Sequence, residues 1–357
     1  MPEPNIETQP RLDPEVLTGF AARIYESLRV PSDAAWLAAD TMVKADLWGH
    51  QSHGLLRLGW YVARIRSGAV NIAAVPRLVK DSGAVVVLDG DDALGPVTTM
   101  RALGEAVERA KKHGVCVVSV RNSNHFGTCM YYTRLGAERG CVMLLMSNAG
   151  PNMAPWGGLR KMIGTNPWSI AAPAGRHGVA VMDMANSGVA RGKIYLAEKR
   201  REPIPADWAI DAAGQPTTDP RKALEGFILP MAGHKGYVMG AMIDILSGVL
   251  SGSGYLDGVH GPYEPTERSG AGHFMVAVDV DAIQPLEQFN SRMEDYIRRL
   301  KDVPLAVGHD QVFFPGELED ATAERNKRLG GIQLPEDTLA DLRRIASEAG
   351  MTAGLPF

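Results

Sequence analysis

The residues of this chain that could do acid–base chemistry first occur together in the run Ser52-His53-Gly54-Leu55-Leu56-Arg57. We expect this run to open a helix, which would place His53 and Arg57 on one face, one turn apart. A neutral imidazole takes a proton from a hydroxyl near pH 7, and a guanidinium holds a carboxylate through two parallel hydrogen bonds. The pair could therefore bind and deprotonate a 2-hydroxy acid, although most histidine–arginine pairs at this spacing are ordinary surface or packing residues.

A second histidine follows a predicted strand at residues 115–120. The strand leads into Arg121-Asn122-Ser123-Asn124-His125-Phe126-Gly127 and then into a predicted helix at residues 126–138. Such a turn can present backbone N–H groups to a phosphate and hold His125 at the edge of a sheet. The alternative is a histidine that only caps the turn. No G-x-G-x-x-G follows any predicted strand, which disfavours an ordinary Rossmann domain.

Metal chemistry is less well supported. His50 and His53 stand three residues apart, but no cluster of carboxylates or cysteines accompanies them. The three cysteines are odd in number and lack C-x-x-C spacing, which predicts neither a disulfide framework nor a zinc site. We therefore predict no metal and expect a reducing, cytoplasmic environment.

Composition excludes several classes of partner. The chain has 357 residues, of which 45% are hydrophobic and 22% charged, enough for a large core and two domains. A net charge of -4 gives no electrostatic footprint for nucleic acid or an anionic membrane. The N-terminus lacks signal-peptide features, and no apolar run approaches the roughly 18 residues of a membrane span. We expect a partner that is a small molecule rather than nucleic acid or membrane.

The predicted elements alternate through the middle of the chain. Strands at 84–88, 115–120, 142–146 and 274–278 are interspersed with helices at 97–112 and 126–138, which argues for an α/β sheet covered by helices. Both ends of the chain are mainly helical. We predict an α/β cofactor-binding domain at residues 76–284 and a helical part, for substrate binding and dimerisation, from residues 1–75 and 285–357.

The chain resembles the malate/L-lactate dehydrogenase family that is unrelated to the Rossmann-fold lactate and malate dehydrogenases. Relatives include ureidoglycolate, sulfolactate and diketogulonate dehydrogenases and the piperideine-carboxylate reductases. Eight motifs in family order, over roughly residues 45–332, carry the resemblance. They are Ser52-His53-Gly54 with Arg57, the run 122–127, residues 154–158, Gly164-Thr165-Asn166-Pro167, residues 183–193, residues 208–220, residues 233–237 and Pro315-Gly316-Glu317.

The resemblance implies an atypical, non-Rossmann NAD(P)-binding α/β domain and a homodimer whose site lies near the subunit interface. It implies acid–base roles for Ser52, His53 and His125 and leaves the choice between the two histidines open. The implied substrate contacts are Arg57, Thr165, Arg191 and Gly192. The implied cofactor contacts are His125, Phe126, Gly127, Asp183, Met184, Ala185, His234, Lys235, Pro315, Gly316 and Glu317.

The predicted activity is hydride transfer between NAD or NADP and a small 2-hydroxy acid, malate- or lactate-like. The main alternative is an NAD(P)H-dependent cyclic-imine reductase of the same family, disfavoured because position 193 is Lys193, whereas those reductases usually carry aspartate there. A rival of another class is a metal hydrolase or lyase built on His50 and His53. Asn186 departs from a common threonine of the family.

Overall fold

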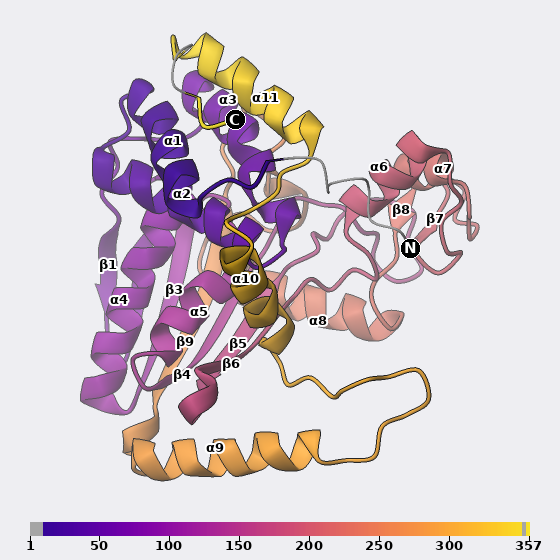
Figure 1. The fold of residues 1–357 in the computed structure, drawn as a ribbon. Helices are drawn as coiled ribbons and strands as arrows, with labels where there is room; N and C mark the ends of the chain where they lie inside the picture. The colour runs from indigo at the N-terminus through magenta and orange to yellow at the C-terminus, as the bar shows by residue number, and fades with distance from the viewer. Residues whose placement is uncertain (1–9, 352–354) are drawn as a thin grey trace.

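A seven-stranded sheet forms the centre of the molecule (Figure 1). The computed structural model describes residues 10–351 and 355–357. The strands run in the order β1-β2-β3-β9-β4-β5-β6, and among them only β2 and β3 pair in parallel. Their bounds are β1 Arg77–Asp81, β2 Val85–Asp89, β3 Val115–Ser123, β4 Cys141–Ser147, β5 Trp168–Pro173, β6 Val179–Met184 and β9 Ala271–Asp279.

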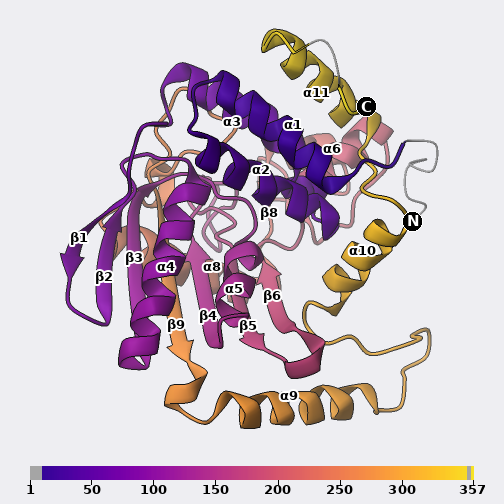
Figure 2. The same cartoon turned by 60° about the vertical axis from the view of Figure 1, so that its left-hand side comes forward.

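Helices cover one face of this sheet. Helix α4 (Gly95–His113) connects the parallel strands β2 and β3, and α5 (Cys129–Ala137) lies beside it over β4 and β5 (Figure 2). Successive side chains of a strand point to opposite faces, so Met143 and Met275 are fully buried under these helices. Leu144 and Val276, which pair across the other face, are only half-buried. The sheet therefore has one apolar face covered by α4 and α5 and one apolar face that is partly open.

The two ends of the chain pack together above the sheet. Helices α1 (Pro14–Ser27), α2 (Ser32–Leu47) and α3 (Leu58–Ser67) share a core with α11 (Glu336–Glu348). Leu12 and Ile332 exchange two backbone hydrogen bonds of 2.9 Å. Helix α10 (Glu317–Arg328) adds Ala323 to this core, whereas α9 (Leu286–Lys301) runs along the far end of the sheet (Figures 1 and 2). Residues 1–9 and 352–354 of the predicted helical part lie outside the described residues.

A small lobe follows β6. It contains α6 (Arg191–Arg200), β7 (Ala209–Ile210), α7 (Pro220–Glu225) and β8 (Phe227–Ile228), and its own core includes Ile194 and Ile228 (Figure 1). Helix α8 (His234–Asp244) leads back to the sheet and continues into a π-helical turn, Ile245–Val249. None of the helices between residues 10 and 351 is both long and apolar enough to cross a membrane.

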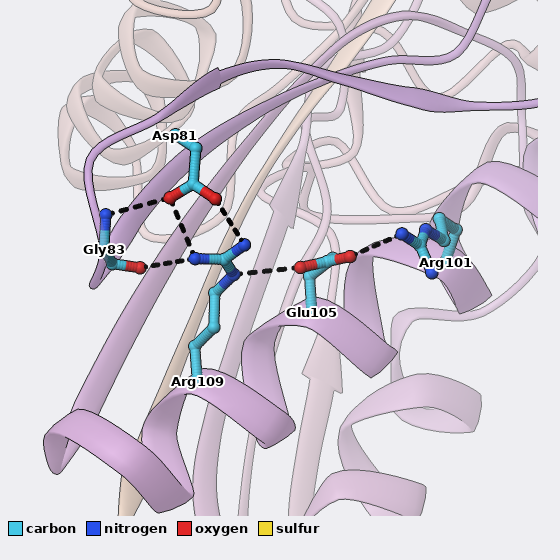
Figure 3. A network of polar contacts seen from close by, with 5 residues as sticks. All are labelled: Asp81, Gly83, Arg101, Glu105 and Arg109. Atoms are coloured by element: carbon cyan, nitrogen blue, oxygen red, sulfur yellow. Dashed lines mark hydrogen bonds and ion pairs between the residues drawn. The ribbon is translucent and has the colours of Figure 1, made fainter.

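Ion pairs fasten α4 to the turn between β1 and β2 (Figure 3). Arg109 donates to both carboxylate oxygens of Asp81, at 2.9 and 2.7 Å, and to the Gly83 carbonyl at 2.9 Å. Its Nε also donates to Glu105, which pairs with Arg101 at 2.6 Å. The hydrogen bonds from Arg109 hold the pKa of Asp81 below its usual value. These contacts fix the exposed edge strand β1, which pairs only with β2 among the described strands.

Candidate active site

His53 and Arg57 lie on two short 3₁₀ turns, so the prediction that one helix carries both was wrong. The turns are Gln51–His53 and Leu55–Arg57, and α3 begins only at Leu58. Gly54 between them is extended, with φ -87° and ψ -153°, and a Cβ at this position would overlap the carboxylate of a buried aspartate. The two functional side chains are still neighbours, but the turn at Gly54 sets their relative positions.

Arg57 is held with part of its guanidinium left for a ligand. Its Nε donates to the Ser52 carbonyl at 2.5 Å, and its Cζ lies 4.1 Å from the ring centroid of Trp60. Within the described residues, neither Nη atom has a hydrogen-bond partner. The edge that binds a carboxylate through two parallel hydrogen bonds is therefore available.

The structure brings Ser52, His53 and His125 together. The two imidazole rings are 5.7 Å apart between centroids and inclined by only 18°. Each ring is held through Nδ1: His53 by the Ser52 hydroxyl at 2.9 Å, and His125 by the Tyr61 hydroxyl at 2.5 Å and the Gly127 amide, which donates at 3.3 Å. In both residues this leaves Nε2 as the atom that can exchange a proton with a ligand.

Tyr61 is a site residue that the sequence analysis missed. It lies on α3, one turn after Arg57, and the same helix also reaches the neighbouring Asn124 through Arg64, whose Nη2 donates to Oδ1 at 3.1 Å. Helix α3 therefore holds two consecutive residues of the loop that carries His125. The signal in the sequence was the spacing of Arg57, Tyr61 and Arg64, which repeats on one helical face.

Both histidines are neutral at pH 7. Burial, reinforced by the positive charge of Arg57 and by His50, lowers the pKa of His53 to about 3. Burial also lowers the pKa of His125 well below its ordinary value, with His53 and Arg57 acting in the same direction. A neutral imidazole can accept a proton, and a carboxylate bound to Arg57 would offset the repulsion that disfavours the imidazolium.

The predicted cofactor segments meet at the end of β6. Asp183 accepts a hydrogen bond of 2.7 Å from the Met130 amide at the start of α5, shortly after Gly127. The Met231 amide donates to Asn186 at 2.8 Å, which brings the start of α8 to the same place. The loop before α10 joins them, because the Val181 amide donates to the Pro315 carbonyl at 3.0 Å. Segments from four parts of the chain thus form one site.

Several predicted cofactor residues have side chains engaged elsewhere. The ring of Phe126 is buried against Tyr132 and His273, so only its backbone is available to a ligand. Asp183 caps α5, and burial raises its pKa to about 6. Glu317 accepts from the Phe314 amide at 3.1 Å and pairs with Lys301. Met184 and Ala185 are half-buried beside Asp183, at the end of the strand.

Glycines and basic side chains at this place suit the phosphates of a dinucleotide. Gly127, Gly233 and Gly316 have φ of 90°, 66° and 92°, a conformation that glycine adopts freely and that brings backbone N–H groups close to a ligand. His234 and Lys235 are exposed on the first turn of α8, where a helix N-terminus favours phosphate. Within the described ranges, no group of three or more metal-ligating side chains is found.

Three of the predicted substrate residues, Thr165, Arg191 and Gly192, lie on segments that contact or follow the end of β6. Thr165 accepts a hydrogen bond of 2.8 Å from the Asn186 amide through its carbonyl, and Gly192 is exposed at the start of α6. Arg191 Nη1 donates to Asn152 Oδ1 at 3.0 Å. The repulsion of Arg191, added to burial, lowers the pKa of Lys161.

Tyr263 connects Arg191 to Arg57. Its ring lies 6.0 Å from that of Trp60, on which Arg57 stacks, and it hydrogen-bonds Asn152, the partner of Arg191. The two arginines therefore flank Tyr263.

Solved structures with this fold include several dehydrogenases and a delta1-piperideine-2-carboxylate reductase. The profile of the family described as malate/L-lactate dehydrogenase matches residues 12–343. A malate dehydrogenase from Pyrococcus abyssi is 35% identical over 353 residues, covering 97% of this chain and 96% of the relative. The solved structure of sulfolactate dehydrogenase from Methanocaldococcus jannaschii superposes with a TM-score of 0.90 at 35% identity, covering 96% of this chain and 98% of the other.

Two further relatives carry a cofactor in their names. A (2R)-3-sulfolactate dehydrogenase (NADP(+)) from Chromohalobacter salexigens is 34% identical, covering 92% of this chain and 95% of the relative. A ureidoglycolate dehydrogenase (NAD(+)) from Escherichia coli is 33% identical, covering 84% of this chain and 85% of the relative. The match of the family profile and these relatives confirm the predicted resemblance, and the chain belongs to the malate/L-lactate dehydrogenase family.

Proposed function

We propose that the chain interconverts a small 2-hydroxy acid and its 2-oxo acid, with hydride transfer to or from NAD or NADP. The observation that carries this proposal is the pair of neutral, nearly parallel imidazoles of His53 and His125 beside the carboxylate-binding edge of Arg57. Oxidation of a secondary alcohol needs a base for the hydroxyl proton and a cation for the adjacent carboxylate. Both groups are present within one site.

The chain's own residues bind the acid and move the proton. Arg57 holds the carboxylate, which places the 2-hydroxyl beside the imidazoles, and Nε2 of a neutral histidine accepts the hydroxyl proton. When NAD(P)+ is bound, its nicotinamide supplies the acceptor for the hydride. In the reverse direction the same imidazolium returns the proton to the new alkoxide.

Tyr61 suits His125 to this cycle. A hydroxyl either donates to or accepts from Nδ1, so Tyr61 can follow a change of tautomer, whereas the Gly127 amide, 3.3 Å from the same Nδ1, favours the tautomer with the proton on Nε2. The Ser52 hydroxyl, 2.9 Å from His53 Nδ1, can likewise either donate to or accept from that ring nitrogen. Each histidine is thus equipped for proton transfer.

A second cationic group favours a malate-like over a lactate-like acid. Arg191 lies near Tyr263, and Lys161 lies close enough to Arg191 to be repelled by it. In the described chain neither Arg191 nor Lys161 pairs with a carboxylate side chain. Arg191 donates only to neutral acceptors, Asn152 Oδ1 and the Leu224 carbonyl, so an acid with a second negative group would give this cation a charged partner.

We further propose that the protein is a cytoplasmic homodimer. Leu144 and Val276 on the open face of the sheet, and the exposed stripe of Val238, Met242 and Ile245 on α8 and the turn after it, are apolar surfaces that a second copy would cover. All three cysteines are free and buried, which suits a reducing compartment. Sedimentation of the wild type and of Val276→Glu tests the dimer, and a wild type that is monomeric at micromolar concentration contradicts it.

The activity is tested by following NADH and NADPH consumption with oxaloacetate, pyruvate and a cyclic imino acid. We expect oxaloacetate to be reduced fastest, and faster turnover of the imine would favour the alternative reductase. His53→Ala and His125→Ala are then compared: the principal acid–base residue should lose about 10²- to 10⁴-fold in kcat with little change in NADH affinity. Near-normal turnover in both variants would refute the mechanism.

A further inference from the structure

A buried carboxylate lies directly beneath the turn that separates His53 from Arg57. It belongs to Asp46, which is 3% exposed and sits in the last turn of α2. After α2 the chain reverses at Gly49, whose φ is 89°, and the His50 amide returns to the Ala45 carbonyl at 2.8 Å. This reversal carries Gly54 and the residues around it back over Asp46.

Asp46 makes two contacts with the turn. Its Oδ2 accepts a hydrogen bond of 2.8 Å from the amide of Leu55, the first residue of the 3₁₀ turn that ends in Arg57. Its carboxylate also packs on Gly54: a Cβ at that position would lie 1.9 Å from Oδ1, 2.1 Å from Cγ and 2.3 Å from Oδ2. No side chain fits between them, so the carboxylate determines where the backbone passes.

We propose that Asp46 is a positioning residue for the reaction, which sets Arg57 relative to Ser52 and His53 by holding the Gly54–Leu55 peptide. The turn before Gly54 carries the proton-transfer pair, and the turn after it carries the carboxylate anchor. Asp46 holds the second turn through the Leu55 amide. At the other end of that turn, Arg57 Nε donates to the Ser52 carbonyl of the first turn at 2.5 Å. A displaced Gly54–Leu55 peptide therefore changes the distance between substrate anchor and base.

This inference rests on the proposed function and predicts an effect on substrate handling rather than on the cofactor. The cofactor segments meet at the end of β6 and include neither Gly54 nor Leu55. Asp46→Ala should therefore raise KM for the hydroxy acid and lower kcat, each at least tenfold, while the Kd of NADH stays within twofold. Binding of oxalate, a carboxylate that does not react, should weaken in parallel when measured by calorimetry.

Three further variants identify the contact responsible. Asp46→Asn keeps an oxygen that accepts from the Leu55 amide and should stay within threefold of the wild type. Gly54→Ala displaces the carboxylate without removing it and should reproduce the loss, even if Asp46→Ala fails to fold. The double variant Asp46→Ala/Gly54→Ala should be no worse than Asp46→Ala, since the added methyl no longer meets a carboxylate.

The matched control is Asp40→Ala, earlier on the same helix. Asp40 accepts a hydrogen bond of 2.6 Å from the Tyr131 hydroxyl and touches neither 3₁₀ turn, so its loss should leave KM unchanged. An active wild type with kcat/KM of Asp46→Ala within threefold of it would overturn the inference, as would NADH affinity falling in step with kcat/KM. A wild type inactive on every 2-hydroxy acid would instead overturn the proposed function.

Discussion

Replacing Asp46 by asparagine should change how the stability of the protein depends on pH. Burial raises the pKa of Asp46 from 3.8 to about 7, although the Leu55 amide acts in the opposite direction. The folded state therefore holds this proton more tightly than the unfolded chain does. The contribution of the carboxyl group to stability is complete below pH 3.8 and is lost as the pH rises toward 7.

The size of the effect follows from the two pKa values. The raised pKa costs the fold about 1.7 kcal/mol at pH 5 and about 4 kcal/mol at pH 8. Asparagine has no charge to bury, so between pH 5 and pH 8 the Asp46→Asn variant should gain about 2.5 kcal/mol relative to the wild type. For a chain of 357 residues this is about 3 °C in Tm.

Thermal unfolding of both proteins at several pH values between 5 and 8 measures this gain. Any constant effect of the amide, such as an unpaired N–H group, cancels because only the change with pH is compared. The control is Asp33→Asn, because Asp33 is exposed at the start of the same helix. The Tm of this variant should change with pH as that of the wild type does. A Tm difference between Asp46→Asn and the wild type that stays constant across this range would refute the reasoning.

Three further outcomes are expected. Tyr61→Phe removes the hydroxyl 2.5 Å from His125 Nδ1 and should lower kcat about 5- to 30-fold and shift its pH profile, since a buried polar contact is worth about 1 to 2 kcal/mol; an unchanged profile would show that Tyr61 does not tune the imidazole. Gly316 has a φ of 92°, and in Gly316→Ala the new Cβ would lie 2.6 Å from Val181 and displace the loop before α10. The Kd of NADH should therefore rise while substrate binding to Arg57 is retained. Arg109→Met removes the ion pairs between α4 and the β1–β2 turn and should lower Tm slightly in low salt, a difference that should shrink in 1 M salt if the contacts are electrostatic.

Much of the sheet is predictable because a buried strand needs an apolar run. The cores of β2, β3, β4 and β9 follow from such runs, as does α4 from its helical pattern. β1 is missed because it is an exposed edge strand that contains Arg77 and Lys80. Its pairing depends on β2 and on Arg109, not on its own hydrophobicity.

The site is predictable residue by residue but not contact by contact. Ser52, His53 and Arg57 stand out by type and spacing, yet the expectation of a continuous helix fails because Gly54 packs on Asp46. That contact, like the one from Tyr61 to His125, joins parts of the chain that meet only after folding. The one local hint of the first contact was Asp46 itself, an aspartate among the apolar residues that end α2.

The central position of β9 has a consequence for the synthesis of the protein. β9 spans residues 271–279 yet lies between β3 and β4, which end by residue 147. A nascent chain that has emerged only to β6 therefore has two open strand edges where β9 will later insert. Such edges pair readily with other chains, so truncated forms ending before residue 271 should aggregate, and the sheet becomes complete only when about three quarters of the chain has been made.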